Sequence, residues 1–178
     1  QRDRISAVER GIWTHALLQH LDLTKDLTNL EVLRAEAMRI VQQQLLTEKQ
    51  LAAVDLESIG YFFQGALGKR LLRNPAGVRR EVSFMLAVPV EEIYGQMEED
   101  RDHVVIQGVI DCLVEEPNGF LLVDFKTDRI TPQNIAEVAA AYRVQVEQYC
   151  RAVEAVFGQQ VWQSYLYFLQ GRLAMKMG

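Results

Sequence analysis

Two carboxylates and one lysine lie close together around a predicted β-hairpin. Asp111 lies in one stretch of apolar and β-branched residues, and Asp124 and Lys126 lie in the next. Asn118 and Gly119, between the two stretches, are typical of a hairpin turn. If these two form the centre of the turn, Asp111 comes opposite Lys126; if the loop is longer, Asp111 comes opposite Asp124. Because alternate residues of a strand share a face, both registers place the three charges on one side of the sheet.

Three charged groups among apolar neighbours are costly unless they are paired or bind a cation. Oxygen ligands suit Mg²⁺ or Mn²⁺, which can hold a phosphate oxygen and a nucleophilic water together. A lysine beside them can orient that water or stabilise developing negative charge. The group is therefore suited to phosphodiester hydrolysis. The alternative from spacing alone is a cross-strand Asp–Lys pair on a solvated sheet edge.

Helical patterns fill the first half of the chain. A capping box formed by Ser6 and Glu9 begins a helix that carries His15. Apolar residues then recur at three- and four-residue intervals, and further N-cap residues follow. The predicted helices cover residues 7–21, 29–46 and 48–54, and a longer one follows Asp55 and ends near Arg73, before Asn74-Pro75.

The second half has the pattern of a sheet. Strands are predicted over residues 82–88, 104–114, 120–125, 161–169 and 173–177. A helical pattern over residues 133–157 predicts one long crossover helix before the fourth strand. We therefore expect one α/β domain over residues 1–178, with a mixed central sheet flanked by helices and a helical N-terminal portion.

Composition limits the class of protein. No apolar run reaches the roughly 18 to 20 residues that cross a bilayer, so we expect a soluble, cytoplasmic protein without membrane partners. The net charge of -5 argues against indiscriminate polyanion binding, although a divalent cation needs carboxylates of its own. The two cysteines, Cys112 and Cys150, indicate neither a disulfide framework nor a cysteine-held cluster. The missing initial Met is interpreted as the sign of a fragment of a longer chain.

Four short motifs, taken in order, resemble the RecB-like nucleases of the PD-(D/E)XK superfamily. They span nearly the whole chain and are more specific together than singly. Their continuation is most similar to the C-terminal nuclease domain of the AddA family of helicase–nuclease subunits. The motifs are Gly11-x-x-x-His15, Gly108-x-x-Asp111, Asp124-Phe125-Lys126-Thr127 and Gln145-x-x-x-Tyr149.

The resemblance implies a restriction-endonuclease-like fold and a DNA exonuclease that uses Mg²⁺ or Mn²⁺. It implies catalytic roles for Lys126, Asp111 and Asp124. Glu81 matches a glutamate that similar nucleases place near the metal, with an edge-strand charge as the alternative. Gln145 and Tyr149 would lie beside the site, one helical turn apart, in a positioning role. The implied metal ligands are His15, Asp111, Asp124 and the backbone carbonyl of Phe125.

The densest basic stretch flanks Asn74-Pro75. Its cations could contact DNA phosphates near the entrance to the site, but basic residues are also common at helix C-termini. Single-stranded DNA would suit a nuclease fed by a helicase. The predicted DNA-binding residues are Lys69, Arg70, Arg73, Arg79 and Arg80.

The resemblance also implies a setting: a helicase–nuclease complex that processes double-strand DNA breaks for recombinational repair. The partners would be the helicase portion of the same polypeptide and an AddB-like second nuclease subunit. Related nucleases carry four cysteines for an iron–sulfur cluster; two cannot hold one, so no cluster is expected. No G-x-x-x-x-G-K-[ST] loop is present, so ATP binding would reside elsewhere. The alternatives are a catalytically silent DNA-binding or subunit-docking module of the same fold, and a free-standing nuclease.

Overall fold

A mixed five-stranded sheet forms the centre of the computed structural model, which describes residues 5–90 and 103–178. The strands lie in the order β1-β2-β3-β4-β5, so neighbours in sequence are neighbours in space. β3 and β4 run parallel and the other pairs are antiparallel. The strands are β1 (Val78–Pro89), β2 (His103–Glu116), β3 (Gly119–Lys126), β4 (Val161–Phe168) and β5 (Leu173–Lys176).

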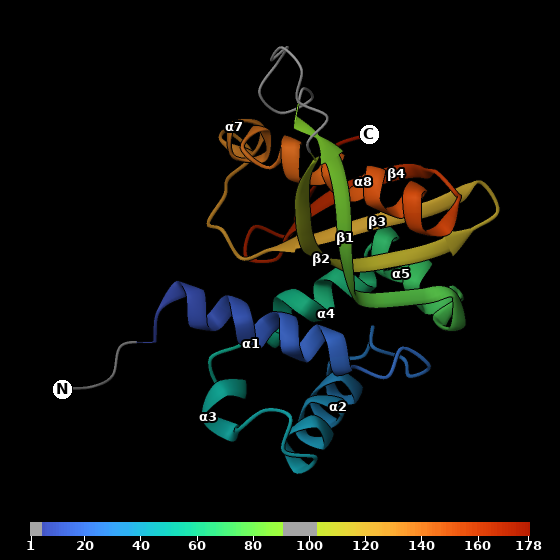
Figure 1. Ribbon diagram of the computed structural model, residues 1–178. Coiled ribbons are helices and arrows are strands. Elements are labelled where there is room, and N and C mark those ends of the chain that lie inside the picture. Colours follow the sequence, from blue (N-terminus) through green and yellow to red (C-terminus); the bar gives the residue numbers. More distant parts are fainter. Residues whose placement is uncertain (1–4, 91–102) are drawn as a thin grey trace.

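Helices cover both faces of this sheet (Figure 1). The N-terminal helices share one hydrophobic core with Cys112, Val123 and Phe125. The helices between β3 and β4 pack over the other face, against Leu122 and Leu166. On the first side lie α1 (Ala7–His20), α2 (Leu30–Gln42), α3 (Glu48–Leu51), α4 (Leu56–Gln64), α5 (Ala66–Arg73) and a 3-10 turn (Pro75–Gly77); on the second lie α7 (Ile135–Ala140) and α8 (Arg143–Phe157).

β3 is the central strand and is covered on both faces. Its residues from Gly119 to Phe125 are all buried, and its pairing with β4 is parallel. Strands of this kind are normally continuous apolar runs, because neither face meets water. Asp124 is the exception in β3, with a side chain that is 2% exposed. A carboxylate in this position needs a compensating cation.

Three predicted helices are shorter than expected. The helix predicted over residues 29–46 ends at Gln42, and Gln44 follows with a left-handed φ of 60°. The helix predicted to end near Arg73 divides at Gly65, which is extended. A Cβ on Gly68 would lie 2.3 Å from the carbonyl oxygen of Phe62, so the division lets α5 pack against the end of α4. The short third helix ends at Leu51.

The crossover predicted as one helix over residues 133–157 is two. α7 ends at Ala140, and Tyr142 is the N-cap residue of α8, with φ -95° and ψ -1°. Val146 and Ala152 then face the sheet from α8. The helical spacing of apolar residues continues through the break, so hydrophobic periodicity did not reveal it.

The hairpin adopts the register that places Asp111 opposite Asp124. Glu115 pairs with Phe120, and Glu116 pairs with Gly119, so Pro117 and Asn118 form the centre of the turn. Gly119 instead begins β3 with φ +123°, and a Cβ there would lie 2.4 Å from the carbonyl oxygen of Gln160. The turn expected at Asn118-Gly119 is therefore shifted by one residue.

The two cysteines lie on opposite faces of the sheet. Cys112 is buried among the N-terminal helices, where burial raises the pKa of its thiol to about 12. Cys150, on α8, packs against the apolar cluster of Leu166 and Phe168. Among the helices formed by residues 5–90 and 103–178, none has the length and apolar character to span a membrane.

Candidate active site

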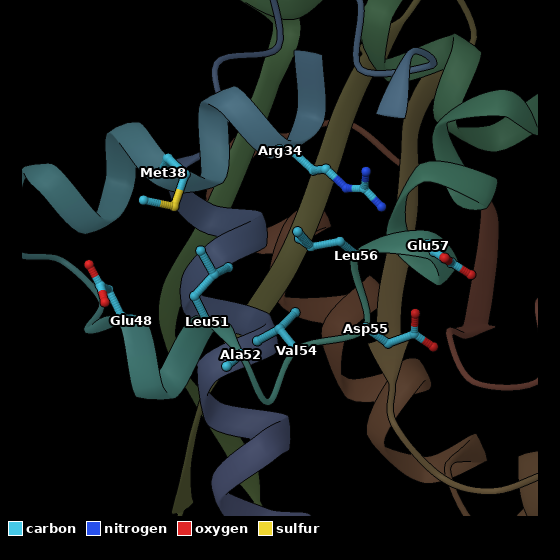
Figure 2. Close-up of a pocket in the computed structure, with 9 residues that line it drawn as sticks. All are labelled: Arg34, Met38, Glu48, Leu51, Ala52, Val54, Asp55, Leu56 and Glu57. Carbon is cyan, nitrogen blue, oxygen red and sulfur yellow. The ribbon is translucent and has the colours of Figure 1, made fainter. Parts of the chain in front are cut away.

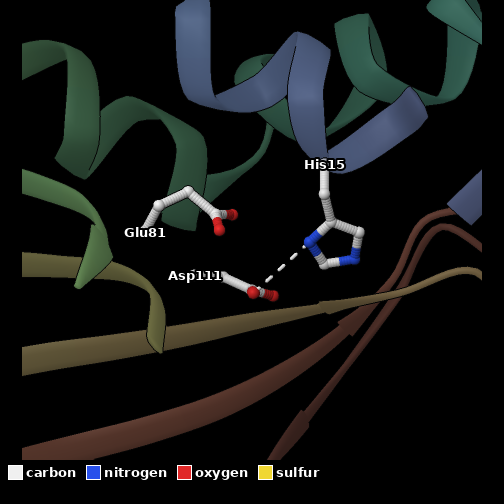
Figure 3. Close-up of side chains that lie close together, drawn as sticks. All are labelled: His15, Glu81 and Asp111. Carbon is white, nitrogen blue, oxygen red and sulfur yellow. Dashed lines mark ion pairs between the residues drawn. The ribbon is translucent and has the colours of Figure 1, made fainter. Parts of the chain in front are cut away.

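His15, Glu81 and Asp111 converge from three different elements. Each offers one ligand atom, and these atoms lie within 4.8 Å of one another. His15 comes from α1, Glu81 from β1 and Asp111 from β2, and the three side chains point toward a common space (Figure 3). Nδ1 of His15 lies 3.3 Å from Oδ1 of Asp111. An imidazole nitrogen and two carboxylates at this spacing form a donor set for a divalent cation.

A backbone irregularity in β1 delivers Glu81 to this cluster. Glu81 has a φ of 52°, a left-handed conformation that is uncommon for a residue with a side chain. Arg80 contacts α1, whereas Val82 packs on the face covered by α8, so the side chains change faces at this point. Such a conformation costs about 1–3 kcal/mol and persists where surrounding structure imposes it, commonly at functional sites.

Asp111 and Asp124 are held in different ways. Oδ2 of Asp111 accepts a hydrogen bond of 2.7 Å from the backbone N–H of Phe125. Oδ2 of Asp124 is buried, finds no hydrogen bond of regular geometry among the described residues, and lies 2.7 Å from Nζ of Lys126 in an ion pair. Burial and the charge of Asp111 raise the pKa of Asp124 to about 7. The ammonium of Lys126 thus pairs with Asp124, while Asp111 contacts His15 and the N–H of Phe125.

The same carboxylates shift the pKa of His15. Burial lowers the pKa of His15, but the hydrogen bond and charge of Asp111, with smaller contributions from Glu81 and Asp124, raise it above its usual value. The pKa of Glu81 is also raised, by burial and by the charge of Asp111. Both shifts arise in part from carboxylates crowded around the site, an arrangement that a bound cation would stabilise.

Lys126 contacts the beginning of α8 and its N-cap residue. Its Nζ donates a hydrogen bond of 3.0 Å to Oε1 of Gln145, and Nε2 of Gln145 donates one of 2.8 Å to the hydroxyl of Tyr149. Nζ also lies 4.1 Å from the centroid of the Tyr142 ring. Burial and the nearby carboxylates raise the pKa of Tyr149 to about 12, so its hydroxyl keeps its proton. Gln145 and Tyr149 thus lie beside the lysine, linked in one chain of hydrogen bonds.

Two glycines explain why separate motifs meet. A Cβ on Gly11 would lie 3.2 Å from Oγ1 of Thr127, so this glycine allows α1 to approach the end of β3. A Cβ on Gly108 would lie 2.8 Å from the ring of Phe84, which makes an edge contact with Tyr149 at 5.6 Å between centroids. The first glycine places His15, and the second makes room for the ring that supports Tyr149.

The five predicted DNA-binding cations separate into two groups. Nε of Arg70 donates a hydrogen bond of 2.8 Å to Glu116, and its guanidinium stacks on Trp162. Arg80 donates to the carbonyl oxygens of Leu18 and Leu21 at 2.8 and 2.7 Å. These two guanidinium groups are engaged in internal contacts. Exposed side chains belong to Lys69, Arg73 and Arg79, although Arg79 also lies 3.9 Å from Glu115 and 5.2 Å from the centroid of the Phe157 ring.

A separate pocket lies among α2, α3 and α4 (Figure 2). Met38, Leu51 and Leu56 line it, together with one arginine, Arg34. Three carboxylates also surround it, those of Glu48, Asp55 and Glu57. The excess of negative charge disfavours a nucleic acid there, and the pocket shares no residue with the cluster of His15.

Tyr142 and Asp128 were not predicted as site residues. The hydroxyl of Tyr142 donates to both carboxylate oxygens of Asp128, at 3.2 and 3.1 Å. One sequence signal was available, because Tyr142 precedes Gln145 by three residues, about one helical turn. The side of the helix that carries Gln145 therefore also carries Tyr142.

Comparison with known proteins identifies a family. The family model described as the PD-(D/E)XK nuclease superfamily matches residues 1–176. An ATP-dependent helicase/nuclease subunit of Moorella thermoacetica is 46% identical over 176 residues, which are 97% of this chain and 12% of that protein. The protein of the same name from Desulforudis audaxviator is 43% identical over 156 residues, 87% of this chain and 12% of that protein. A third, from a Thermoanaerobacter species, is 37% identical over 172 residues, which are 95% of this chain and 14% of that protein.

The chain spans between 12% and 14% of the length of these relatives. The family match and the mixed sheet flanked by helices confirm the predicted restriction-endonuclease-like α/β fold. The chain belongs to the PD-(D/E)XK nuclease superfamily.

Proposed function

We propose that this chain is a DNA exonuclease module that depends on Mg²⁺ or Mn²⁺. The observation that carries the proposal is the convergence of His15, Glu81 and Asp111 within 4.8 Å. The ion pair of Asp124 and Lys126 lies beside this cluster, on the strand next to Asp111. Membership of a nuclease superfamily is consistent with phosphodiester hydrolysis. So is a group of carboxylates with one lysine beside it.

The predicted ligand set fits a divalent cation with one addition. His15, Asp111 and Asp124 supply a nitrogen and carboxylate oxygens, and the predicted fourth ligand is the carbonyl of Phe125, whose own N–H is fixed by Asp111. The geometry supports adding Glu81 to the set. The buried oxygen of Asp124 without a regular hydrogen bond has a lone pair that suits a metal. When bound, such a cation polarises a phosphate and acidifies a water molecule.

Lys126 is the proposed catalytic lysine. Its ammonium lies 2.7 Å from the buried carboxylate of Asp124. A fixed positive charge stabilises the negative charge that develops on a phosphate during hydrolysis. Gln145 orients the ammonium, and Tyr149 orients Gln145. These two residues position the lysine rather than react.

We further propose that the chain is one nuclease domain, residues 1–178, near the C-terminus of a longer polypeptide. The relatives are named as ATP-dependent helicase/nuclease subunits, which supports a helicase portion on the same polypeptide. That portion would feed single-stranded DNA to the site, in the cytoplasm, within a complex that contains an AddB-like partner. The role would be the processing of double-strand breaks for recombinational repair. Exposed Lys69, Arg73 and Arg79 would contact phosphates.

The test is cleavage of an end-labelled single-stranded oligonucleotide by this chain. We expect shortening of the strand from one end with Mn²⁺ or Mg²⁺, none with a chelator, and a loss of at least about 100-fold in Lys126→Ala. Lys49→Ala, an exposed lysine on α3, is the matched control and should cleave as the parent does. Cleavage that persists in chelator, or at the parental rate in Lys126→Ala, contradicts the proposal. Absence of both cleavage and Mn²⁺ binding, measured by calorimetry, would support the silent module instead.

A further inference from the structure

We infer that Tyr142 is a positioning residue for Lys126, holding the ammonium against its ring while Asp128 tethers the ring. The inference about geometry stands on the contacts of Lys126, and its consequence for catalysis rests on the proposed function. Nζ of Lys126 lies 4.1 Å from the centroid of the Tyr142 ring. A cation at this distance over an aromatic face is attracted by the ring.

The ring completes a three-sided enclosure of the ammonium. Asp124 contacts Nζ at 2.7 Å, Gln145 at 3.0 Å, and the Tyr142 ring lies on a third side. The Lys126 side chain is 13% exposed, so little of it meets solvent. A lysine has a flexible four-carbon stem and a compact charge, so a single ion pair does not fix its position. The ring therefore restricts the position of the ammonium in addition to its ion pair with Asp124.

Tyr142 is itself fixed to the segment that carries the lysine. Its hydroxyl donates to both oxygens of Asp128, two residues after Lys126 in the chain. Burial and Asp128 raise the pKa of this hydroxyl to about 12, so it remains a donor at neutral pH. The ring is thus tied to the end of β3 rather than only to α8.

The break between α7 and α8 makes this contact possible. Tyr142 is the N-cap residue of α8, and Gln145 follows one turn later. The contacts of Tyr142 and Gln145 with Nζ therefore both come from the N-terminal end of α8. A change at Tyr142 should act on the chemical step through Lys126, and not on the cation, whose proposed ligands lie on α1, β1, β2 and β3.

The first measurement needs neither metal nor activity. In protein with ¹³C-labelled lysines, the ε-methylene protons of Lys126 should be shifted upfield by the ring current, relative to the other four lysines. The signal is assigned by its loss in Lys126→Ala. We expect the shift to persist in Tyr142→Phe and to vanish in Tyr142→Leu. An unshifted Lys126 signal in the parent, or a shift retained in Tyr142→Leu, overturns the inference.

The second measurement is steady-state cleavage of the same oligonucleotide. Tyr142→Leu should lower kcat by roughly tenfold, the effect of a lost cation–π contact, with KM and Mn²⁺ affinity unchanged. Tyr142→Phe, which keeps the ring, should recover most of that loss. Tyr61→Leu is the matched control, because its ring lies under Arg172, in a cation–π pair elsewhere. It should leave kcat at the parental value.

The two measurements separate the inference from the proposed function. If the parent does not cleave DNA, the proposed function fails, and the ring-current shift still decides whether Tyr142 holds Lys126. If the parent cleaves and Tyr142→Leu retains its kcat, Tyr142 does not position the lysine. Equal losses in the Leu and Phe variants, with weakened Mn²⁺ binding, would also overturn the inference, since they would place the effect in the metal site.

Discussion

Asp111 and Asp124 illustrate how two identical residue types acquire different roles. Asp111 is partly exposed, contacts His15 and accepts the amide of Phe125. Asp124 is buried beside Lys126, and burial with the charge of Asp111 raises its pKa to about 7. The difference comes from position in the sheet, since Asp124 lies on the central strand. Without a cation, the two carboxylates repel each other, and the fold loses stability.

Asp111→Asn should therefore stabilise the metal-free protein at high pH. Asp124 has a pKa of about 7 in the fold against 3.8 in an open chain, so its cost appears as pH rises between these values. Removing the neighbouring charge should add about 1 kcal/mol at pH 8, a rise of roughly 2–4 °C in Tm. The raised pKa of His15 acts in the opposite direction, because its pairing with Asp111 stabilises the fold only while the imidazole is charged. The gain should therefore disappear below about pH 6.

Thermal unfolding in chelator at pH 8 and pH 5.5 tests this expectation. Glu154→Gln, an exposed carboxylate on α8, removes one charge away from the site and is the matched control. Added Mn²⁺ should raise the Tm of the parent and leave Asp111→Asn unchanged. A variant that is less stable than the parent at both pH values would contradict the proposed repulsion.

Among the elements, α1 has the position on which the site depends most. It brings His15 from early in the chain to β1 and β2, and Gly11 allows its close approach to Thr127. A side chain on Gly11 would meet Oγ1 of Thr127 at 3.2 Å, which is tighter than ordinary van der Waals contact. A small displacement of α1 would then be felt at His15, one turn further along the helix.

Gly11→Ala should weaken Mn²⁺ binding more than it weakens the fold. We expect an affinity loss of several-fold and a stability loss of at most about 1–2 kcal/mol from the added methyl group. Calorimetry with Mn²⁺ and thermal unfolding measure the two quantities. Gly60→Ala is the control, because a Cβ there would lie 3.5 Å from Leu33, an ordinary contact, within helix α4. It should be neutral or stabilising, with unchanged Mn²⁺ affinity; an equal loss of affinity in both variants would contradict the role of Gly11.

The sequence predicted the elements better than their ends. Alternation of apolar residues located the five strands, and helical spacing located the helices around them. The fold class is confirmed, because the positions of the apolar residues decide which segments form strands and which form helices. The same patterns missed the breaks at Gly65 and at Tyr142, because apolar spacing continues through them. The left-handed Glu81 is imposed by contacts between distant segments, and no local pattern encodes it.

The candidate site also combines features that local patterns predict with contacts between distant segments that they do not. Asp111, Asp124 and Lys126 could be placed together from strand pairing, and the structure does lay Asp111 opposite the Asp124–Lys126 pair. The contact of His15 with Asp111 requires α1 to cross the sheet, which spacing along the chain does not specify. The internal contacts of Arg70 and Arg80 were likewise hidden, since a guanidinium has the same sequence signature whether it faces solvent or a carboxylate.

For the whole molecule, an overall charge of -5 conceals a basic stretch of sequence, residues 69–80, which has five cations and no acidic residue. Lys69 and Arg73 are exposed on α5, and Arg79 is exposed at the beginning of β1. Long-range attraction of DNA depends on such local groups rather than on the total. Arg70 lies in the same stretch but holds Glu116 on β2, so it contributes to the fold.

The double variant Lys69→Ala with Arg73→Ala should weaken binding of single-stranded DNA and reduce its dependence on salt. If both contact phosphates, the slope of log affinity against log salt should fall by roughly 1.4, about 0.7 for each contact. Fluorescence anisotropy over a salt series measures it. Arg34→Ala with Lys49→Ala is the matched control and should leave the slope unchanged, because Arg34 lines the acidic pocket of Figure 2 and Lys49 is exposed on α3. An equal slope in all three proteins would assign these cations to solvated surface.

Arg80 and Glu81 are consecutive in β1, yet both meet the same helix. Arg80 binds the carbonyl oxygens of Leu18 and Leu21 at the end of α1, and Glu81 meets His15. Each residue of a helix advances about 1.5 Å and turns by roughly 100°. A slip of α1 by one residue along the sheet would therefore rotate His15 away from Glu81, while Arg80 would lose both carbonyls. The rotation of α1 about its own axis is in this way fixed by Arg80 and Glu81, two adjacent residues of a strand. That rotation is the one that brings His15 to Asp111.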